Sequence, residues 1–498
     1  MNPIVLVGAG PGGPEHLTQA ACQALQQAEV VLYDSLIDPR LLSLVSPQAE
    51  TRSVQGLSQT EINNLLIHHH RNHRRVVRLK SGDPFIFGKA TQELQALAAA
   101  DCIYHVIPGI STVTGAATLA GIPLTDREWG RTIGIFTAHA PDDLDWSALA
   151  RMDMLVGLMG VSHLDTIQTQ LLQNGRGPDT PVALIHRAGQ IGQAIWRGTL
   201  AELAAQPAQA PSVLIVGEGV RHQAQCQSRL PLQGKNILVT RAAGSGGEME
   251  QLLRDYGANV VSLPTLVVEP PPDWTALDRA ITQLAQFHWL ILTSANGVDY
   301  FLERLWYHGL DVRALAHLKI AVVGEKTALH LQKWGLRADL IPQEFVADQL
   351  LAAFPCDCQN VRVLFPRVAS GGRDVLVQGL QQRGAEVLEV AAYETRCPET
   401  IPPFILEYLQ RGWIDVLTFT SSKTVVHCYQ LLEQAAPGVW RTWLTKSCIA
   451  AIGPQTARTC ERYFHRVDMV AKEYTLPGLV QAIVAHYCHP HHRRSVSI

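Results

Sequence analysis

The sequence has 498 residues, of which 47% are hydrophobic and 17% are charged, and its formal net charge is −3. A chain of this length and composition is globular and long enough for roughly two to four domains. The near-neutral charge excludes a general nucleic-acid binder, which needs a positive excess. No apolar run approaches the roughly 18 residues of a membrane span, so we expect neither nucleic acid nor membrane as a partner.

Ten cysteines are scattered along the chain without a C-x-x-C pair or a zinc-type spacing. This usage is typical of reduced thiols in a cytosolic protein. No charged and apolar leader precedes Ile4, so the sequence predicts a cytoplasmic location.

The histidine-rich stretch 68–75 is interpreted as a basic helix end, with a metal site as the less favoured alternative. The tail 488–498 is expected to be disordered, and we predict no metal site.

From residue 3 to about residue 219, short β-type runs alternate with helical patterns. Strands separated by helices indicate an α/β arrangement with largely parallel pairing. The expected strands are Ile4–Val7, Val30–Tyr33, Val76–Leu79, Tyr104–Ile107, Thr132–Thr137, Met154–Met159, Val182–Ile185 and Ser212–Val216. Residues 221–235 then lose the apolar periodicity and gain glutamine, which predicts a linker between domains.

The first strand runs into a glycine-rich turn, VGAGPGGPEHLT (residues 7–18). Gly8, Gly10 and Gly13 fit G-x-G-x-x-G, and Asp34 closes the next apolar run at the spacing of a ribose-binding acid. This pattern alone would indicate a dinucleotide-dependent oxidoreductase. A lone G-x-G-x-x-G is weak evidence, however, so the rest of the domain must decide.

Two further loops with special backbone geometry follow strands, RLKSGDPFIFGK and VIPGISTVTGAATLAGIPLT. With GAGPGGP, YDSLIDP and LMGV, they make residues 4–219 resemble the tetrapyrrole methylase family, specifically the uroporphyrinogen-III C-methyltransferases. That family usually has Gly-Pro-Gly-Asp-Pro in its first turn. Here Gly13 stands in place of the aspartate, and this departure creates the dinucleotide-like pattern.

The resemblance implies S-adenosylmethionine bound between two α/β subdomains, with a tetrapyrrole substrate beside it. The positions that match the family's methyl-donor site are Pro11, Ser81, Gly82, Asp83, Ile86, Ser111, Thr112, Met159 and Ala188. Ala188 occupies a position that the family often gives to glycine. The Asp83 carboxylate could accept a hydrogen bond from the donor, and the alternative is a carboxylate that caps the turn before Pro84.

Asp34 matches the acid that the family places near the pyrrole, and we interpret it as catalytic. A pyrrole carbon that attacks a sulfonium methyl becomes cationic and must lose a proton, and a carboxylate serves both steps. The methyl must also lie in line between sulfur and carbon. Arg127 and Arg131 are candidate ligands for substrate carboxylates, although exposed arginines are common.

The segment TRSVQGLSQTEINNLL (residues 51–66) departs from the family, which carries a Gly-Lys-Arg sequence after its second strand. The lysine is deleted here. Because such a lysine can handle protons or bind carboxylates, an alternative is an impaired methylase domain that only holds its ligand.

The second half contains an internal repeat. LTSANGV matches FTSSKTV, with Thr293 and Thr420 about 127 residues apart, and VVGEKTA matches AIGPQTA at a similar offset. The repeat predicts two similar α/β lobes that face each other across a cleft. Its Thr-Ser and Gly-x-x-Thr-Ala turns offer hydroxyls and backbone N–H groups at helix starts, which suits carboxylates. Simple helix capping is the alternative.

These blocks, with AAYETRCP and AKEYTLPGL, make residues 235–487 resemble uroporphyrinogen-III synthase. The resemblance implies cyclisation of hydroxymethylbilane with inversion of its last pyrrole, without cofactor or metal. Tyr393 matches the tyrosine that this family associates with its active site, where a phenol could assist departure of the hydroxyl; packing at a strand end is the alternative. Candidate ligand-binding residues are Thr293, Ser294, Thr327, Thr420, Ser421 and Thr456, with Arg241, Arg367 and Lys423 as basic groups that would steer a polyanion.

The expected fold is α/β throughout: a methylase fold of two α/β subdomains over 1–220, the linker 221–235 and a two-lobed synthase with internally repeated lobes over 236–487. In that synthase, segments 236–266 and 398–487 form one lobe and 270–393 the other. We expect a bifunctional enzyme whose C-terminal half makes uroporphyrinogen III and whose N-terminal half methylates it at C2 and C7 to precorrin-2. The resemblance also implies a homodimer through the methylase domain. An oxidoreductase and a non-enzymatic binding module remain as rival classes.

Overall fold

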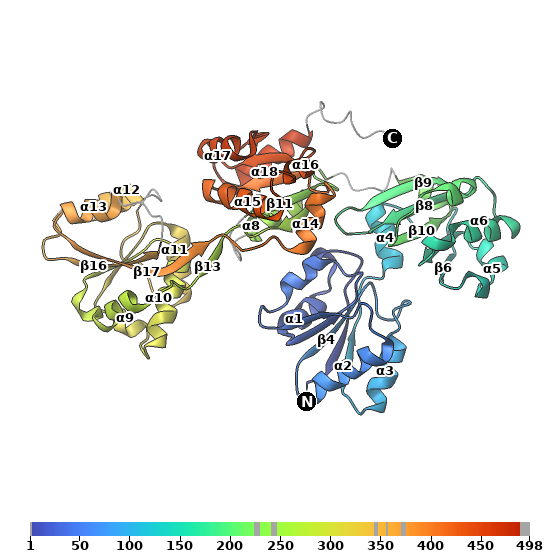
Figure 1. Ribbon diagram of the computed structural model, residues 1–498, viewed down its shortest axis with the longest axis horizontal. Coiled ribbons are helices and arrows are strands. Elements are labelled where there is room, and N and C mark those ends of the chain that lie inside the picture. Colours follow the sequence, from blue (N-terminus) through green and yellow to red (C-terminus); the bar gives the residue numbers. More distant parts are fainter. Residues whose placement is uncertain are drawn as a thin grey trace. The chain divides into compact units, whose positions relative to one another are not determined.

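Figure 1 shows the computed structural model, which describes residues 2–223, 230–240, 247–342, 347–354, 357–369 and 375–488. The chain divides into two compact units. The first comprises Met1–Asn236, Arg254–Val261 and Pro403–Asp415, and the second comprises Ile237–Leu253, Ser262–Pro402 and Val416–Ile498. Among the residues that the structure describes, no helix is long and apolar enough to span a membrane. The described strands form four five-stranded sheets.

The first sheet is entirely parallel. Its strands are β1 (Ile4–Gly8), β2 (Val30–Tyr33), β3 (Glu50–Ser53), β4 (Val76–Lys80) and β5 (Tyr104–Ile107). Their order is β3-β2-β4-β1-β5, with Val5 opposite Val77 and Val30 opposite Val76. The near-continuous apolar runs of β1, β2 and β4 suit a parallel sheet that is covered on both faces.

Helices cover both faces of this sheet. They are α1 (Gln19–Gln27), α2 (Gln59–Arg71) and α3 (Ala90–Ala99). Helix α1 packs with Val31 and Val77 on one face, and α2 and α3 pack with Leu32 and Val76 on the other; Figure 1 shows β4 between them. Alternate residues of a strand point to opposite faces, so Arg78 shares the α3 face with Val76.

The second sheet is mixed, which differs from the expected parallel pairing. Its strands are β6 (Ile133–Thr137), β7 (Met154–Leu158), β8 (Pro181–His186), β9 (Ala194–Thr199) and β10 (Ser212–Val216). The order is β6-β7-β10-β8-β9, and only β6 and β7 pair in parallel. The turn between β8 and β9 is too short for the crossover helix of a parallel pair, so these strands form a hairpin.

Helices α4 (Thr112–Ala120), α5 (Trp146–Ala150) and α6 (Leu164–Gln173) accompany this sheet. Helix α4 packs its buried alanines against β7, β8 and β10, and Figure 1 shows it beside β8. Leu164, Ile167 and Leu171 of α6 cover the other face. Short 3-10 helices span Pro14–His16, Pro39–Leu44, Pro141–Asp143, Val161–His163, Leu200–Ala205, Glu218–His222, Leu284–Gln286 and Val312–Leu315.

Two further sheets come from the second half of the chain. One contains β11 (Asn236–Thr240), β12 (Asn259–Ser262), β18 (Val416–Phe419), β19 (Cys448–Ala451) and β20 (Met469–Val470) in the order β12-β11-β18-β19-β20. The other contains β13 (Val267–Glu269), β14 (Trp289–Leu292), β15 (Lys319–Val322), β16 (Arg362–Val368) and β17 (Glu386–Arg396) in the order β13-β17-β16-β14-β15. In both sheets, helices lie between successive strands in the sequence, as in α/β folds.

The helices of this half lie between those strands. They are α8 (Gly247–Asp255), α9 (Thr275–Thr282), α10 (Ala295–Tyr307), α11 (Glu325–Lys333), α12 (Ala347–Ala353), α13 (Val375–Gln382), α14 (Pro403–Gln410), α15 (Ser422–Ala435), α16 (Trp440–Trp443), α17 (Pro454–Phe464) and α18 (Leu476–Cys488). Residues 224–229 of the expected linker and 489–498 of the tail lie outside the described residues. The α/β class expected from the sequence is confirmed.

Candidate functional site

A cavity of about 680 Å³ lies at the carboxyl ends of β1, β2 and β4, where open α/β sheets bind their ligands. Residues that follow β7 and β8 of the second sheet complete its wall. The predicted residues that line it are Pro11, Asp34, Ser81, Ile86, Thr112, Met159 and Ala188. Leu36, Phe87 and Ile185 add apolar surface. An apolar pocket with a few convergent polar groups is suited to an organic ligand.

The glycines of the dinucleotide-like pattern bring three strand-end loops into contact. Gly10 and Gly82 exchange backbone hydrogen bonds of 3.2 and 3.0 Å. A Cβ atom on Gly8 would lie 2.4 Å from the backbone nitrogen of Gly109, closer than real Cβ contacts. The turn therefore needs glycine because other backbone segments pack directly against it.

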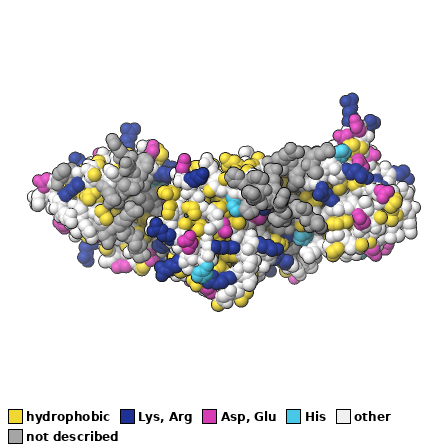
Figure 2. Space-filling view, turned by 90° about the horizontal axis from the view of Figure 1, so that it is seen from above, with side chains coloured by type: hydrophobic (Ala, Val, Ile, Leu, Met, Phe, Trp, Pro, Cys, Tyr) yellow, Lys and Arg dark blue, Asp and Glu magenta, His cyan; other side chains and the backbone are white. Residues whose placement is uncertain are grey.

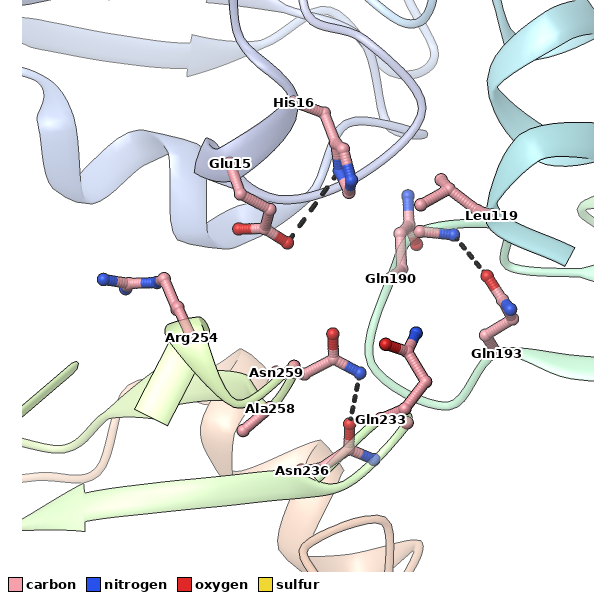
Figure 3. A pocket seen from close by; sticks show the side chains of 13 residues that line it. Glu15, His16, Leu119, Gln190, Gln193, Gln233, Asn236, Arg254, Ala258 and Asn259 are labelled. Carbon is pink, nitrogen blue, oxygen red and sulfur yellow. Dashed lines mark hydrogen bonds and ion pairs between the residues drawn. The ribbon is translucent and has the colours of Figure 1, made fainter. Parts of the chain in front are cut away.

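The loop after β8 packs against the same turn. The Gly13 N–H donates to the Gly189 carbonyl at 3.3 Å. The Gly189 N–H donates to Gln193 Oε1 at 2.7 Å, and Figure 3 shows the Gln193 side chain with this hydrogen bond, near Gln190. A Cβ atom on Gly12 would lie 2.0 Å from the Gly189 carbonyl oxygen. This contact places Ala188 at the cavity wall.

Asp83 holds its own loop together. Its Oδ1 accepts the Phe85 N–H at 2.9 Å and its Oδ2 accepts the Gly109 N–H at 3.1 Å. Neither Asp83 nor Gly82 lines the cavity, and Ser111 caps α4 by accepting the Val113 N–H at 3.3 Å. The capping alternative thus describes the contacts of Asp83 in this structure, and its contact with a methyl donor remains a prediction.

Asp34 is the acidic residue of the cavity wall, and its side chain is 30% exposed. The Arg78 guanidinium donates to its Oδ1. Arg78 Nε also donates to Glu93 Oε1 at 3.0 Å, and Lys80 Nζ donates to both oxygens of Glu93 at 3.0 and 2.9 Å. Two cations and two carboxylates thus form one network at the inner end of the site.

Arg78, Lys80 and Glu93 are functional candidates that the sequence motifs did not predict. The signal was present, because two cationic residues at alternate positions interrupt the apolar strand VVRLK and so point to the same sheet face. Burial lowers the pKa of Lys80, and nearby Arg78 lowers it further, while Glu93 opposes the shift. Charges buried in this way require partners.

Two cavity residues have unusual backbone conformations. Met159 has a φ of 55° and Arg187 a φ of 48°, in the left-handed region that non-glycine residues rarely adopt. Arg187 Nε donates to the Ile191 carbonyl at 3.0 Å, and Gln190 Nε2 donates to the Leu36 carbonyl at 2.9 Å. Outliers of this kind cluster at functional sites. Arg187 and Gln190 are wall residues that sequence reasoning missed.

Arg127 and Arg131 do not line this cavity. Both are exposed, and Arg131 Nε donates to the Arg127 carbonyl at 3.3 Å. Basic and acidic side chains are interspersed over the described surface on the face shown in Figure 2. The structure therefore brings Asp34, but neither arginine, to the methyl-donor residues.

In the second half, Tyr393 and Ser294 come together. Tyr393 lies in β17 and is 8% exposed, and its hydroxyl lies 3.0 Å from Ser294 Oγ. Ser294 caps α10 by accepting the Gly297 N–H at 3.0 Å. The ring of Tyr300 stacks on Tyr393 at 5.9 Å between centroids. A phenol, a hydroxyl and a helix N-terminus thus meet at the end of β14.

The second Thr-Ser turn has the same local structure after β18. Ser421 caps α15 by accepting the Thr424 N–H at 3.3 Å. Lys423 Nζ donates to Thr395 Oγ1 at 2.6 Å, which holds its charge near the strand that carries Tyr393.

The remaining predicted residues of this half occupy similar turns. Thr293 and Thr420 are half-buried, whereas Thr327 and Thr456 are buried in the first turns of α11 and α17. Arg367 of β16 pairs with Glu389 of β17. Arg241 lies outside the described residues.

Comparisons with known proteins match two separate segments of the chain. A family model described as tetrapyrrole (corrin/porphyrin) methylases matches residues 3–204. A model described as uroporphyrinogen-III synthase HemD matches residues 247–481. The chain is 30% identical over 499 residues to the porphyrin biosynthesis protein HemD of Ruminiclostridium josui, and the match covers 97% of each chain.

Separate proteins of Synechococcus elongatus match the two halves. Its uroporphyrinogen-III synthase is 45% identical over 255 residues, which cover 51% of this chain and 96% of that protein. Its uroporphyrinogen-III C-methyltransferase is 47% identical over 227 residues, which cover 44% and 93%. The solved uroporphyrin-III C-methyltransferase of Thermus thermophilus is 36% identical, with a TM-score of 0.41 and coverage of 44% and 94%.

These matches define an enzyme of tetrapyrrole biosynthesis that joins two enzyme families in one chain. The chain belongs to the tetrapyrrole methylases over its N-terminal part and to the uroporphyrinogen-III synthases over its C-terminal part. A dinucleotide-dependent oxidoreductase is thereby overturned as an interpretation of the glycine turn, since the same residues belong to the methylase match.

Proposed function

We propose that the chain is a bifunctional enzyme. Its C-terminal half cyclises hydroxymethylbilane to uroporphyrinogen III, and its N-terminal half methylates that product at C2 and C7 to precorrin-2, for sirohaem or corrinoid synthesis. The observation that carries the methylase proposal is the convergence of Pro11, Asp34, Ser81, Thr112 and Met159 on one cavity. These residues follow five different strands. Pro11, Ser81, Thr112 and Met159 match the family's methyl-donor site, and Asp34 matches the acid that the family places near the pyrrole.

The methyl donor is S-adenosylmethionine, which supplies an activated methyl group when bound. The cavity of about 680 Å³ lies within the range of roughly 300–1,000 Å³ typical of small-molecule sites. Its wall combines the apolar Ile86 and Met159 with the hydroxyls of Ser81 and Thr112. Apolar groups suit a ring and an aliphatic chain, and hydroxyls suit the polar groups of a nucleoside.

Asp34 acts on the pyrrole ring. When the new carbon–methyl bond forms and the sulfur–methyl bond breaks, positive charge develops on the ring, which Asp34 stabilises as a carboxylate. The proton on the methylated carbon then leaves to Asp34 or to water. Because Asp34 stands on the cavity wall beside Ser81 and Thr112, the same pocket holds donor and acceptor.

For the synthase half, the Tyr393–Ser294 pair supports the proposed site. The phenol of Tyr393 donates a proton toward the departing hydroxyl of hydroxymethylbilane, which leaves as water. The N-termini of α10 and α15, capped by Ser294 and Ser421, favour carboxylates. Thr293, Thr327, Thr420 and Thr456, with Arg367, are the further proposed contacts for the substrate's carboxylates, and no cofactor is proposed for this half.

We extend the proposal to the domain boundaries, with a methylase over 1–220, a linker over 221–235 and a synthase over 236–487. In the synthase, one lobe comprises 236–266 and 398–487, and the other 270–393. A cytoplasmic homodimer that pairs through the methylase domain completes the proposal.

A coupled assay on the purified chain tests both activities. Hydroxymethylbilane is supplied with and without S-adenosylmethionine, and products are followed by mass and isomer separation. A product heavier than uroporphyrinogen III by two methyl groups supports both halves. Uroporphyrinogen III that accumulates unmethylated supports the second candidate, a synthase with an impaired or ligand-holding methylase, which the deleted lysine of residues 51–66 favours.

A further inference from the structure

The network behind Asp34 is almost entirely buried. Side-chain exposure is 3% for Arg78, 2% for Lys80 and 0% for Glu93, whereas Asp34 is 30% exposed. Of these four residues, Asp34 alone lines the cavity. The network therefore has one member that can meet a substrate and three that act behind it.

The guanidinium of Arg78 is held in place from four directions. Its Nε donates to Glu93 at 3.0 Å, its Nη1 donates to the carbonyls of Leu32 at 3.4 Å and Leu79 at 3.1 Å, and its Nη2 donates to Asp34. A planar fork with these partners cannot rotate without breaking several hydrogen bonds. The position of the Asp34 carboxylate is thereby tied to the backbone of β2 and β4.

Charge balance explains why a lysine and a glutamate lie in the same core. Glu93 accepts from both Arg78 and Lys80, so the four side chains together carry no net formal charge. An unpaired charge in this position would be strongly destabilising. Glu93 and Lys80 thus allow Arg78 to reach Asp34 from inside the sheet.

We propose that Arg78 is a positioning residue for methyl transfer, which fixes the Asp34 carboxylate against the pyrrole, with Glu93 and Lys80 as its charge-balancing pair. This inference rests on the proposed methyltransferase activity. Small displacements of a catalytic group are costly, on the order of 100-fold in rate for about 1 Å. A role in stability alone would not depend on what stands at position 34.

The test uses the full chain with Arg78→Lys, Asp34→Asn and the double variant. Arg78→Lys keeps the charge but loses the fork, so we expect kcat for methyl transfer to fall on the order of 100-fold, with KM for uroporphyrinogen III changed far less. Affinity for S-adenosylhomocysteine, measured by calorimetry, should stay as in the unsubstituted chain. Arg75→Lys is the matched control, because Arg75 precedes the same strand but is exposed and pairs with Glu29 at 3.6 Å.

The double variant separates positioning from stability. If Arg78 acts through Asp34, then Arg78→Lys should reduce methyl transfer little further when Asp34 is already asparagine, because coupled residues are non-additive. Additive losses, or a fully active Arg78→Lys variant, would overturn the proposal. Loss of S-adenosylhomocysteine binding in Arg78→Lys would instead show a structural role, and would also count against it.

Asp34→Glu gives an independent check, since it keeps the charge and moves the carboxylate by one methylene. We expect low methyl transfer with normal S-adenosylhomocysteine affinity, and full activity would contradict the positioning role. Failure of the proposed function has a different signature: the unsubstituted chain would bind S-adenosylhomocysteine yet methylate nothing.

Discussion

At the scale of single residues, the two proposed catalytic groups depend on different supports. Asp34 is held by a buried guanidinium, whereas Tyr393 is held by a serine hydroxyl that also caps a helix. The former contact is charged and the latter neutral. Charge-assisted hydrogen bonds are roughly twice as strong as neutral ones, so we expect Asp34 to be the more rigidly placed group.

Replacing Tyr393 by phenylalanine tests the proposed synthase site. The ring and its stacking on Tyr300 remain, and the hydroxyl beside Ser294 is lost. Positioned acids contribute about 100-fold or more to a rate, so the formation of uroporphyrinogen III should fall by that order. Tyr300→Phe, which loses a hydrogen bond to the Val268 carbonyl, should have the smaller effect in the same assay. The reverse order would contradict the role of Tyr393.

At the scale of elements, the strand-end loops of the first unit are held by backbone contacts. Gly109→Ala would place a Cβ atom 2.3 Å from the Gly82 carbonyl oxygen. We expect a loss of stability of about 1–3 kcal/mol or more from this overpacking, measured by urea unfolding. Gly177→Ala is the control, because its Cβ would meet only Thr180 Oγ1 at 3.9 Å, and it should be close to neutral.

Helices α9 and α10 are joined by a charged contact that depends on pH. Arg304, and to a lesser extent His308, lower the pKa of Asp278 to about 2. A carboxylate with a depressed folded-state pKa stabilises the fold above its unfolded pKa, near 4, and loses that contribution as pH falls toward 2.

Asp278→Asn should therefore lower the thermal midpoint at neutral pH, and the difference from the unsubstituted chain should shrink between about pH 4 and pH 2. Scanning calorimetry over that range measures it. Glu303→Gln, an exposed change on α10 next to Arg304, should leave the midpoint unchanged at both ends of this pH range. A difference that persists at pH 2 would rule out the charge as its cause.

Much of the architecture could be predicted from local patterns. All eight expected strands of the first half are present within a residue or two. Glu50–Ser53 was missed because its sequence, ETRS, is polar, and Ala194–Thr199 because half-exposed hairpin strands lack a strong apolar run. The antiparallel pairing of the second sheet depends on loop length, which periodicity does not encode.

The site was predictable only in part, because sequence motifs identify residues within one loop but not contacts between separate elements. Residues carried by motifs, such as Ser81 and Thr112, reach the cavity. The Asp34–Arg78–Glu93 network joins residues on two strands and a helix, so no single motif contains it. Asp83 shows the opposite case, because its motif position does not reveal that both carboxylate oxygens already accept backbone N–H groups.

At the scale of the whole molecule, the two proposed activities belong to separate segments of one chain. The methylase match covers residues 3–204 and the synthase match covers residues 247–481. Asp34→Asn should abolish most methylation and leave cyclisation unchanged. Tyr393→Phe should lower cyclisation and leave methylation unchanged when uroporphyrinogen III is supplied directly, because in the coupled assay the methylase depends on the product of the synthase. Each variant is the control for the other when the two activities are assayed separately with mass detection. Loss of both activities in either variant would contradict separate sites. Tethering would raise the local concentration of the intermediate at the methylase.

Helix α4 joins the cavity to the core of the second sheet. It begins with Thr112 at the cavity and buries Ala116 and Ala120 in the core of the second sheet. A ligand that contacts Thr112 therefore restrains α4, whose C-terminal half packs in the core of the second sheet. We expect S-adenosylhomocysteine to slow amide hydrogen exchange at Met154, Val156 and Ile215, which share a core with α4 but do not line the cavity, so that occupancy of the donor site can be detected at residues away from it.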